Sequence, residues 1–345
     1  MAVTGKEVVS LIIPAYQEEK RIERCLRNIL ASTYRYLELI VVNDGSTDRT
    51  EAIVRHLKEI NASAERVIEI VNIDHGGSGR ARNFGLRRAE GKYIGFVDAD
   101  DMIHPQMIER LVQSLQEGND MASCGLLFCE EDGKAGLRQS RLHKSKIACP
   151  LPALGTVMWE QIQMNMGSVL FHRERVMDEE GELSVSCPEN VVAFEDFAFI
   201  CRYLSRCDGL WEVLPFYGYF YCRRKGSLSS QAWSARELSD ALQPILAVGE
   251  MTGKEAFDSH KLQYAFRFMA HWYEEAFRCR RQDFLVDSDE RKICMQELER
   301  YADIYMKSSK VSRYRKAAMW IVRRHPKTGF FLAKTVGRLL LFKKR

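Results

Sequence analysis

The chain has 345 residues, of which 46% are hydrophobic and 28% charged, an ordinary balance for a soluble protein with a buried core. Its N-terminal apolar run, residues 8–13, is too short for a signal peptide or a membrane span, and no run of 18 apolar residues follows. The ten cysteines show no C-x-x-C spacing, which favours buried thiols in a reducing compartment. We therefore expect a cytoplasmic protein of two units, or of one large domain with an extension.

The net charge of +4 is unevenly spread. Thirteen of the 51 Lys and Arg residues, and none of the 47 acidic ones, lie in residues 307–345. Mixed with aromatic and aliphatic residues, these charges predict an interfacial basic tail that binds an anionic membrane surface. Packing of its apolar residues on the rest of the chain is the alternative. Nucleic acid is the weakest candidate, because no nucleic-acid-binding module is recognisable elsewhere.

Short apolar runs alternate with amphipathic stretches through the first 130 residues. We predict strands at residues 8–13, 37–42, 67–71, 93–97 and 121–128, and helices at residues 18–30, 48–60, 78–89 and 105–117. Such alternation indicates an α/β fold with a mostly parallel sheet covered on both faces. The loops at the carboxyl ends of its strands are then the expected ligand site.

The second half of the chain is less regular. Residues 130–150 are polar and predict a mobile loop, followed by a strand at 167–172, a helix at 195–205 and a strand at 210–222. Residues 235–305 have a helical pattern with few breakers. We therefore predict a catalytic domain at 1–232, a helical region at 233–306 and the basic amphipathic tail at 307–345.

Two acidic loops follow predicted strands. Asp98-Ala99-Asp100 places two carboxylates at the end of strand 93–97, an arrangement that suits Mg²⁺ or Mn²⁺. The alternative is a turn before the helix at 105–117, with Asp101 as its cap. In Asn43-Asp44-Gly45-Ser46-Thr47-Asp48, a turn with Asp48 as helix cap is favoured on chemistry alone. Asp44 as acceptor from a nucleobase N–H is the alternative.

The glycines of residues 76–79 give no dinucleotide fingerprint, because Arg82 stands where the third glycine would fall. Instead, six strings together resemble glycosyltransferase family 2. They are IIPAYQEE, VVNDGSTD, GGSGRARNFGL, GKYIGFVDADD, FEDFAFICRYL and YCRRKGSLS, and they run in the family's order over roughly residues 8–230. Each string is common alone, but six in order are specific.

The resemblance implies a GT-A nucleotide-diphospho-sugar transferase fold with a C-terminal helical extension. It implies an inverting hexosyl- or N-acetylhexosaminyltransferase that uses a UDP-sugar donor with Mg²⁺ or Mn²⁺. The implied acceptor is a surface glycan or a lipid-linked precursor in cell-envelope polysaccharide biosynthesis. The enzyme would lie in the cytoplasm or peripherally on the inner face of the cell membrane. Its oligomeric state is left open.

The resemblance also implies residue roles. Pro14, Ala15 and Tyr16 would hold the base, Glu18 the ribose, Asp44 the base N3–H and Arg82 the base carbonyl edge. Asp98 would meet the ribose or the metal, and Asp100 would ligate the metal. Asp196 would be the catalytic base, with Glu195 the lesser candidate, and Arg223, Arg224 and Ser227 would close over the pyrophosphate. A charge pair at a helix start is the alternative for Glu195-Asp196.

Two histidines depart from the family's pattern. His75 stands where many relatives have Asn, and His172 lies in a string that usually ends in two arginines. Both positions are expected near the sugar or the acceptor, so these departures leave the identity of the donor sugar and of the acceptor open. His172 as a third metal ligand is less favoured than His172 packed in the core. The aromatic residues at 266–277 are expected to pack in a helical core, with an acceptor platform as the alternative.

Two other functions fit less well. A nucleotidyltransferase of similar fold would need a Gly-rich basic loop after the first strand, which residues 14–18 lack. A non-catalytic nucleotide-sugar-binding subunit of an assembly would not need Asp98, Asp100 and Asp196 intact.

Overall fold

The computed structural model describes residues 7–61, 63–130, 135–140, 145–158, 165–189, 191, 195–223, 299, 302–303, 306–307 and 313–324. The chain divides into two units, Met1–Ser227 and Leu228–Arg345. The predicted domain end at residue 232 and most of the predicted helical region at 233–306 lie outside the described residues. So do the aromatic residues at 266–277, and these predictions stay open.

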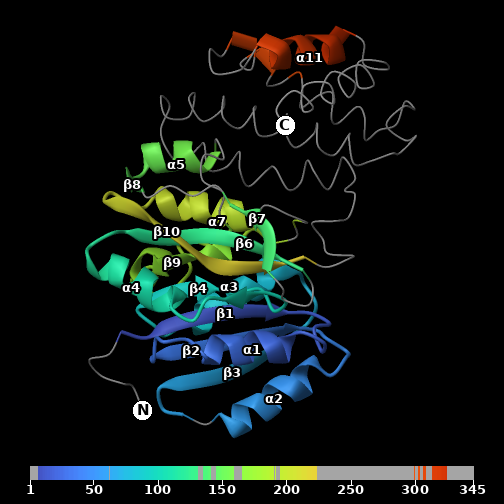
Figure 1. Cartoon of the computed structure of the whole chain (residues 1–345), viewed down its shortest axis with the longest axis vertical. Helices are drawn as coiled ribbons and strands as arrows, with labels where there is room; N and C mark the ends of the chain where they lie inside the picture. The colour runs from blue at the N-terminus through green and yellow to red at the C-terminus, as the bar shows by residue number, and fades with distance from the viewer. Residues whose placement is uncertain are drawn as a thin grey trace. The chain divides into compact units, whose positions relative to one another are not determined.

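The first unit contains a sheet of ten strands among the described residues, in the order β3-β2-β1-β4-β9-β6-β10-β5, with β7 beside β6 and β8 beside β10. Figure 1 shows the strands following one another along the vertical axis from β3 to β10. The strands are β1 (Val9–Ala15), β2 (Leu37–Asp44), β3 (Arg66–Ile73), β4 (Tyr93–Phe96), β5 (Met102–Ile103), β6 (Met121–Cys129), β7 (Ala135–Gln139), β8 (Ser145–Ala148), β9 (Val169–His172) and β10 (Leu210–Cys222). Strands β3, β2, β1 and β4 are parallel, and β9 runs antiparallel between β4 and β6.

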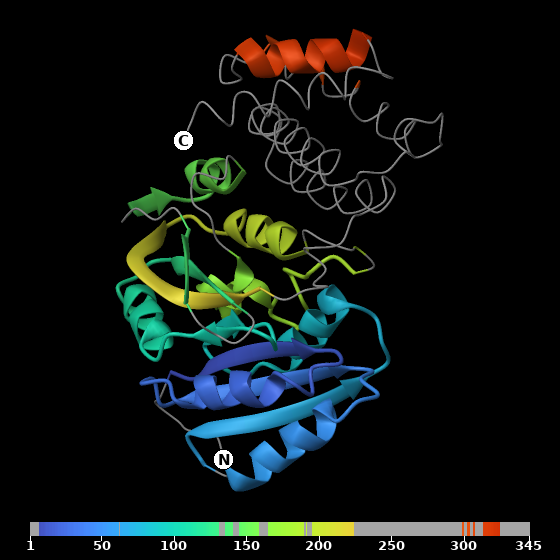
Figure 2. The ribbon, with the colours of Figure 1, turned by 45° about the vertical axis from the view of Figure 1, so that its right-hand side comes forward.

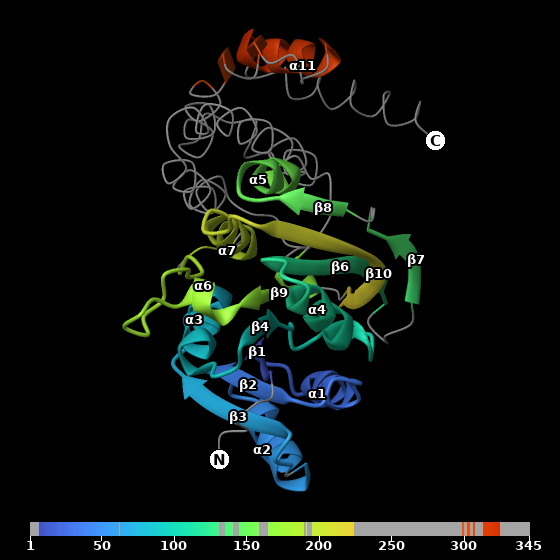
Figure 3. The ribbon, with the colours of Figure 1, turned by 90° about the vertical axis from the view of Figure 1, so that its left-hand side faces the viewer.

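Helices cover both faces of this sheet. They are α1 (Ile22–Leu30), α2 (Thr50–Ile60), α3 (Ser78–Arg88), α4 (Met107–Gln116), α5 (Leu151–Met158), the 3₁₀ turn η1 (Met166–Ser168), α6 (Arg173–Val176) and α7 (Glu195–Leu204). In Figure 3, α1 and α4 lie on one side of the strands, and α3 and α7 lie on the other; Figure 2 gives an intermediate view.

The alternation of strand residues explains why both faces need cover. In β1, Leu11 and Ile13 belong to the core cluster that includes residues of α1 and α4. The intervening Ile12 faces α3, where a Cβ on Gly85 would lie only 2.4 Å from its side chain. Glycine at position 85 therefore lets α3 approach the strand closely. A parallel strand buried on both faces reads as a continuous apolar run, as residues 8–13 do.

The structure confirms the predicted parallel sheet, and the predicted strands and helices of the first 130 residues appear within a few residues of their predicted ends. The prediction of a mobile loop at residues 130–150 is wrong. Two strands lie there, β7 paired with β6 and β8 paired with β10. Their polar sequences carry little strand signal, because their pairing comes from strands that are remote in sequence.

In the second unit the longest described helix is α11 (Arg313–Arg324), within the predicted tail. Arg323 forms ion pairs with Glu299 at 2.6 Å and Asp303 at 3.1 Å, while Trp320 is 56% exposed. Among the described residues, none of the helices combines the length and hydropathy that crossing a membrane requires.

Candidate active site

The parallel register brings three predicted loops to one edge of the sheet. Pro14 and Ala15 at the end of β1 pair with Val42 and Asn43 of β2. The β2 end pairs in turn with the end of β3, and Val97, after β4, donates its N–H to the Ile12 carbonyl at 3.0 Å. The segments that follow β1, β2 and β4 therefore begin side by side, as expected for a ligand site of an open α/β sheet.

The loops after β1 and β2 are bonded to each other. Gln17, in the left-handed region at φ 56°, donates its backbone N–H to Ser46 Oγ at 3.0 Å and its amide to Thr47 at 2.9 Å. Glu18 donates its backbone N–H to Thr50 Oγ1 at 2.9 Å. Asp48 accepts the Thr50 N–H at 3.0 Å. It lies one residue before Arg49, the N-cap of α2, so this bond is a local Asx turn at the helix start and not the predicted cap.

Glu18 and Tyr16 lie in different environments within the first loop. The Glu18 carboxylate is buried and forms an ion pair with Arg21 at 3.1 Å. Tyr16 is 45% exposed, and its ring stacks on His75 with centroids 4.1 Å apart and planes at 24°. The aromatic face expected to hold a base is thus paired with the histidine that departs from the family's pattern.

Asp44 holds the loop after β3. Its two carboxylate oxygens accept the backbone N–H groups of Gly76 at 2.8 Å and Gly77 at 2.9 Å, and His75 Nδ1 lies 3.0 Å from Oδ2. Gly45 allows this approach, because it has φ 72° and a Cβ there would lie 2.9 Å from the His75 nitrogen. Each carboxylate oxygen has a second lone pair, so Asp44 can still accept a base N–H.

Arg82 connects the loop after β4 to the start of α7. Its Nη2 donates to Asp98 Oδ1 at 2.9 Å and its Nη1 to Glu195 Oε1 at 2.7 Å. The arginine is 6% exposed. Burial disfavours its charge, but Asp98 and Glu195 more than offset this and raise the Arg82 pKa. Arg82 thus contacts two carboxylates that sequence reasoning assigned to the site.

The two carboxylates at the start of α7 differ in their partners. Glu195 also accepts from Ser78 Oγ at 2.7 Å. Burial alone would raise the Glu195 pKa, but the Arg82 guanidinium and the Ser78 hydroxyl lower it below 4.5. Asp196 accepts the Phe197 backbone N–H at 2.6 Å and is only partly buried. Both residues are partly buried, but the Glu195 carboxylate is held by one ion pair and one hydroxyl from α3, whereas Asp196 bonds a backbone N–H of its own helix.

Asp101 has a structural role that differs from the expected cap. It is 1% exposed and accepts from Tyr219 Oη and the Cys222 N–H, both at 2.7 Å. Tyr219 Oη in turn accepts the Asp98 N–H at 3.2 Å. Burial, and then the charges of Asp98 and Asp100, raise the Asp101 pKa. Asp101 and Tyr219 thus fix the acidic loop to β10. Asp101 was recognisable in the sequence as part of the acidic string, but no motif predicted a role for Tyr219.

Asp98 and Asp100 have the donor chemistry of a site for a hard divalent cation. Both are partly exposed, and the backbone carbonyl of Asp100 is held by Arg24 Nη2 at 2.8 Å. No group of three or more His, Cys, Asp or Glu within the described part of the chain is arranged to hold a metal by itself. Two carboxylates fit Mg²⁺ or Mn²⁺ that takes further ligands from substrate phosphates.

The basic segment after β10 is described only at its start. Arg223 donates its backbone N–H to the Cys129 carbonyl at 2.9 Å, and its guanidinium lies over the Phe128 ring at 4.9 Å. Arg224 and Ser227, the other residues expected at the pyrophosphate, lie outside the described residues.

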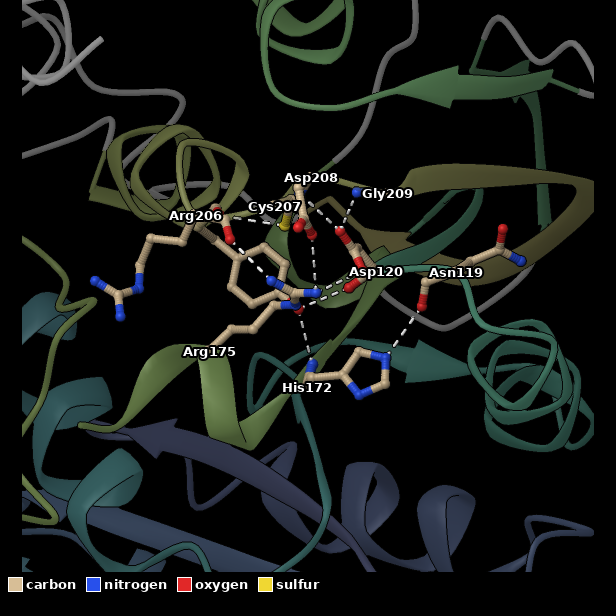
Figure 4. A network of polar contacts seen from close by, with 9 residues as sticks. Asn119, Asp120, His172, Arg175, Arg206, Cys207, Asp208 and Gly209 are labelled. Carbon is tan, nitrogen blue, oxygen red and sulfur yellow. Dashed lines mark hydrogen bonds and ion pairs between the residues drawn. The ribbon is translucent and has the colours of Figure 1, made fainter. Parts of the chain in front are cut away.

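His172 lies far from the acidic loop. It pairs with Tyr93 at the start of β4, whereas Asp98 follows the end of β4, a separation of about 16 Å along the strand at 3.3 Å per residue. Its Nε2 lies 3.0 Å from the Asn119 carbonyl. In Figure 4, His172 belongs to a network around Asp120 and Arg175, which are 2.8 Å apart. The favoured packed role is therefore correct, and the third-metal-ligand role is wrong.

A pocket of about 410 Å³ opens between α3, residues 182–189 and α7. Sequence reasoning did not find it. Asn83 of α3 fixes one wall by donating to the Cys187 carbonyl at 2.9 Å and accepting the Cys187 N–H at 2.8 Å.

Comparison with known proteins places these loops in a family context. The model of "Glycosyl transferase family 2" matches residues 10–175. The uncharacterized glycosyltransferase YibD of Escherichia coli is 37% identical over 122 residues, 35% of this chain and 34% of that protein. Glycosyltransferase GlyG of Streptococcus pneumoniae is 37% identical over 111 residues, 32% of this chain and 36% of that protein. The chain thus spans about a third of the length of the curated relatives it matches.

Solved structures agree on the architecture. S. aureus TarS in complex with UDP-GlcNAc matches 96% of this chain and 92% of its own, with a TM-score of 0.72 at 19% identity. The mannosyltransferase PcManGT from Pyrobaculum calidifontis, in complex with GDP-Man and Mn²⁺, matches with a TM-score of 0.53 at 18% identity and covers 97% of this chain and 88% of its own. These likenesses confirm the GT-A fold.

Proposed function

Because this chain belongs to glycosyltransferase family 2, we propose that it is an inverting glycosyltransferase. It moves a sugar from a UDP-sugar to a hydroxyl of a surface-glycan or lipid-linked acceptor, assisted by Mg²⁺ or Mn²⁺. The UDP-GlcNAc bound by TarS supports a UDP-sugar donor, and the Mn²⁺ in the PcManGT complex supports a divalent ion.

The contact of Arg82 with both Asp98 and Glu195 carries this proposal. It ties the start of α7, where Asp196 lies, to the acidic loop at the ligand edge of the sheet. A donor diphosphate at Asp98 and Asp100 and a proton acceptor at Asp196 then belong to one site. Transfer of a sugar from a diphosphate to a hydroxyl needs both groups at the same reacting carbon.

Each residue then has a task in the reaction. Tyr16 and Asp44 bind the base of the donor. The acceptor hydroxyl attacks the reacting carbon of the sugar from the face opposite the leaving UDP. The bond between that carbon and the diphosphate oxygen breaks, and Asp196 takes the proton of the hydroxyl. Arg223 and the basic residues after it stabilise the charge on the departing diphosphate. A divalent ion bound at Asp98 and Asp100 would supply further charge neutralisation.

We further propose that the enzyme works in the cytoplasm, peripherally on the inner face of the cell membrane. The acid-free basic tail supports this location, because several Lys and Arg near an anionic leaflet each contribute about 1 kcal/mol. The exposed Trp320 of α11 also suits an interfacial position.

The test is UDP release from a panel of UDP-sugars by the purified full chain, with Mn²⁺ and with EDTA. We expect slow hydrolysis of one or two donors with Mn²⁺ and none with EDTA. Asp196→Asn keeps the side-chain shape but removes the proton acceptor, so turnover should fall by roughly 10²–10⁴ with UDP affinity unchanged. UDP binding without release from any donor would instead favour a non-catalytic nucleotide-sugar-binding protein.

A further inference from the structure

The pocket between α3, residues 182–189 and α7 adjoins the candidate catalytic pair. Cys187 lies in the wall of the pocket. Its burial raises the pKa of the Cys187 thiol to about 12; the positive charge of Arg82 lowers this pKa, and the negative charges of Glu195 and Asp196 raise it. Cys187 is bonded to Asn83, whose neighbour Arg82 on α3 pairs with Glu195 at 2.7 Å, so the pocket wall lies close to the start of α7. In Figure 3, the segment after α6 that forms this wall lies on the same side of the sheet as α3 and α7.

A half-buried arginine in this pocket has no counter-ion among the described residues. Arg202 of α7 donates Nη1 to the Ser186 carbonyl at 2.7 Å, and no described carboxylate lies within ion-pairing distance of it. Burial accordingly lowers the Arg202 pKa, whereas the carboxylate partners of Arg82 and Arg175 raise theirs despite burial. An unpaired, partly desolvated cation is unfavourable, and a bound anion would relieve that cost.

The rest of the lining is consistent with an incoming anion. Arg87 of α3 also lines the pocket and has no acidic partner among the described residues. Glu182 and Glu189 line it too and, like Arg87, are exposed. Glu189 accepts from Asn83 at 2.8 Å, and neither glutamate pairs with these arginines. Two guanidinium groups can each offer paired N–H donors to a phosphate or carboxylate.

We propose that this pocket is an acceptor subsite that binds an anionic group, a phosphate or a carboxylate, of the glycan that receives the sugar. The inference rests on the proposed glycosyltransferase function. Asp196 lies in the first turn of α7 and Arg202 in its last, about 9 Å apart along the helix axis at 1.5 Å per residue. The anion therefore belongs to a part of the acceptor other than the reacting hydroxyl.

The experiment measures binding of small anions to the full chain by calorimetric titration, with saturating UDP present to occupy the donor site. The probes are glycerol 3-phosphate and glucuronate, and their uncharged counterparts are glycerol and glucose. We expect saturable binding of at least one charged probe and none of the uncharged ones. Arg202→Gln and Arg87→Gln should each weaken that binding at least tenfold.

The matched control is Arg88→Gln. Arg88 neighbours Arg87 on α3 but pairs with Glu69 at 3.1 Å and does not line the pocket, so anion affinity should not change. Thermal melts establish that all three variants are folded. Binding of only one probe supports the subsite and identifies the anion. No saturable binding by the wild type, or equal affinity in the Arg202 and Arg87 variants, overturns it.

The two proposals fail separately. UDP release from UDP-sugars without acceptor tests the proposed function and does not require the pocket. Anion binding in the presence of UDP tests the pocket and does not require turnover.

Discussion

Glu195→Gln tests whether the first carboxylate of α7 positions the site rather than taking the acceptor proton. The substitution keeps the side-chain shape and one acceptor oxygen but removes the charge that faces Arg82. Arg82 then keeps only Asp98 as an anionic partner, and that side chain is 37% exposed. We expect a loss of unfolding free energy, together with a smaller loss of turnover than Asp196→Asn causes.

The magnitude follows from the contacts. Removing one partner of a buried ion pair typically costs about 3–5 kcal/mol. Glutamine still accepts from Arg82 or Ser78, and Asp98 still pairs with the arginine, so the charge-assisted hydrogen-bond scale of about 1.5–3 kcal/mol is the better guide. Because Tm shifts by roughly 2–4 °C per kcal/mol in a domain of this size, we expect a decrease of about 3–12 °C.

The effect should depend on pH. The Glu195 pKa in the folded protein lies below 4.5, so its charge stabilises the fold fully above that value. The contribution is lost as the pH falls through the lowered folded-state pKa. The stability gap between the wild type and Glu195→Gln should therefore be constant near neutral pH and should narrow below pH 4.5.

The assay is urea unfolding of both proteins at pH 7 and at acidic pH values where the wild type remains folded. Glu179→Gln, at an exposed glutamate, should change stability by less than about 0.5 kcal/mol. Equal stability of the wild type and Glu195→Gln at pH 7 would refute the ion-pair argument. If Glu195→Gln were inactive while Asp196→Asn turned over normally, the roles of the two carboxylates would be reversed.

Four further predictions follow from the site and its scaffold. Asp100→Ala should abolish transfer and Mn²⁺ binding in the presence of UDP while Tm is kept; full activity of this variant in EDTA would contradict a metal role. The base pocket predicts tighter titration of UDP than of GDP or ADP, and Asp44→Ala should weaken UDP binding; equal affinities for the three nucleotides would exclude uracil recognition. Asp120→Ala, which leaves Arg175 only the exposed Asp208 at 3.4 Å as an acidic partner, should cost about 3–5 kcal/mol in urea unfolding, and a change below 1 kcal/mol would mean that the network of Figure 4 is not a stabilising one. A chain ending at Met306 should lose co-sedimentation with anionic liposomes, and equal pelleting of the two proteins would rule out the tail as a membrane anchor.

Local patterns predicted the first part of the fold well. The apolar runs of β1, β2 and β4 are buried on both faces, so their strands are visible as continuous hydrophobic sequence. The turn that Asp48 makes at the start of α2 was also predictable, because its bond to Thr50 spans only two residues, although Arg49 and not Asp48 is the N-cap. By contrast, β8 is polar and half-buried, and it is a strand because it pairs with β10, more than 60 residues later in the chain.

Local sequence was enough to predict the alternation of strands and helices and the acidic residues that follow the strands, because both depend on neighbouring residues and on periodicity. It also placed Glu195 and Asp196 together, but it did not distinguish the surroundings of the two carboxylates. Only the folded arrangement brought Arg82 between Asp98 and Glu195 and left Arg202, beside a pocket, without a carboxylate partner in the part of the chain that the structure describes. Those environments are set by burial and by partners 16 to 113 positions away in the chain, and no local pattern encodes such pairings.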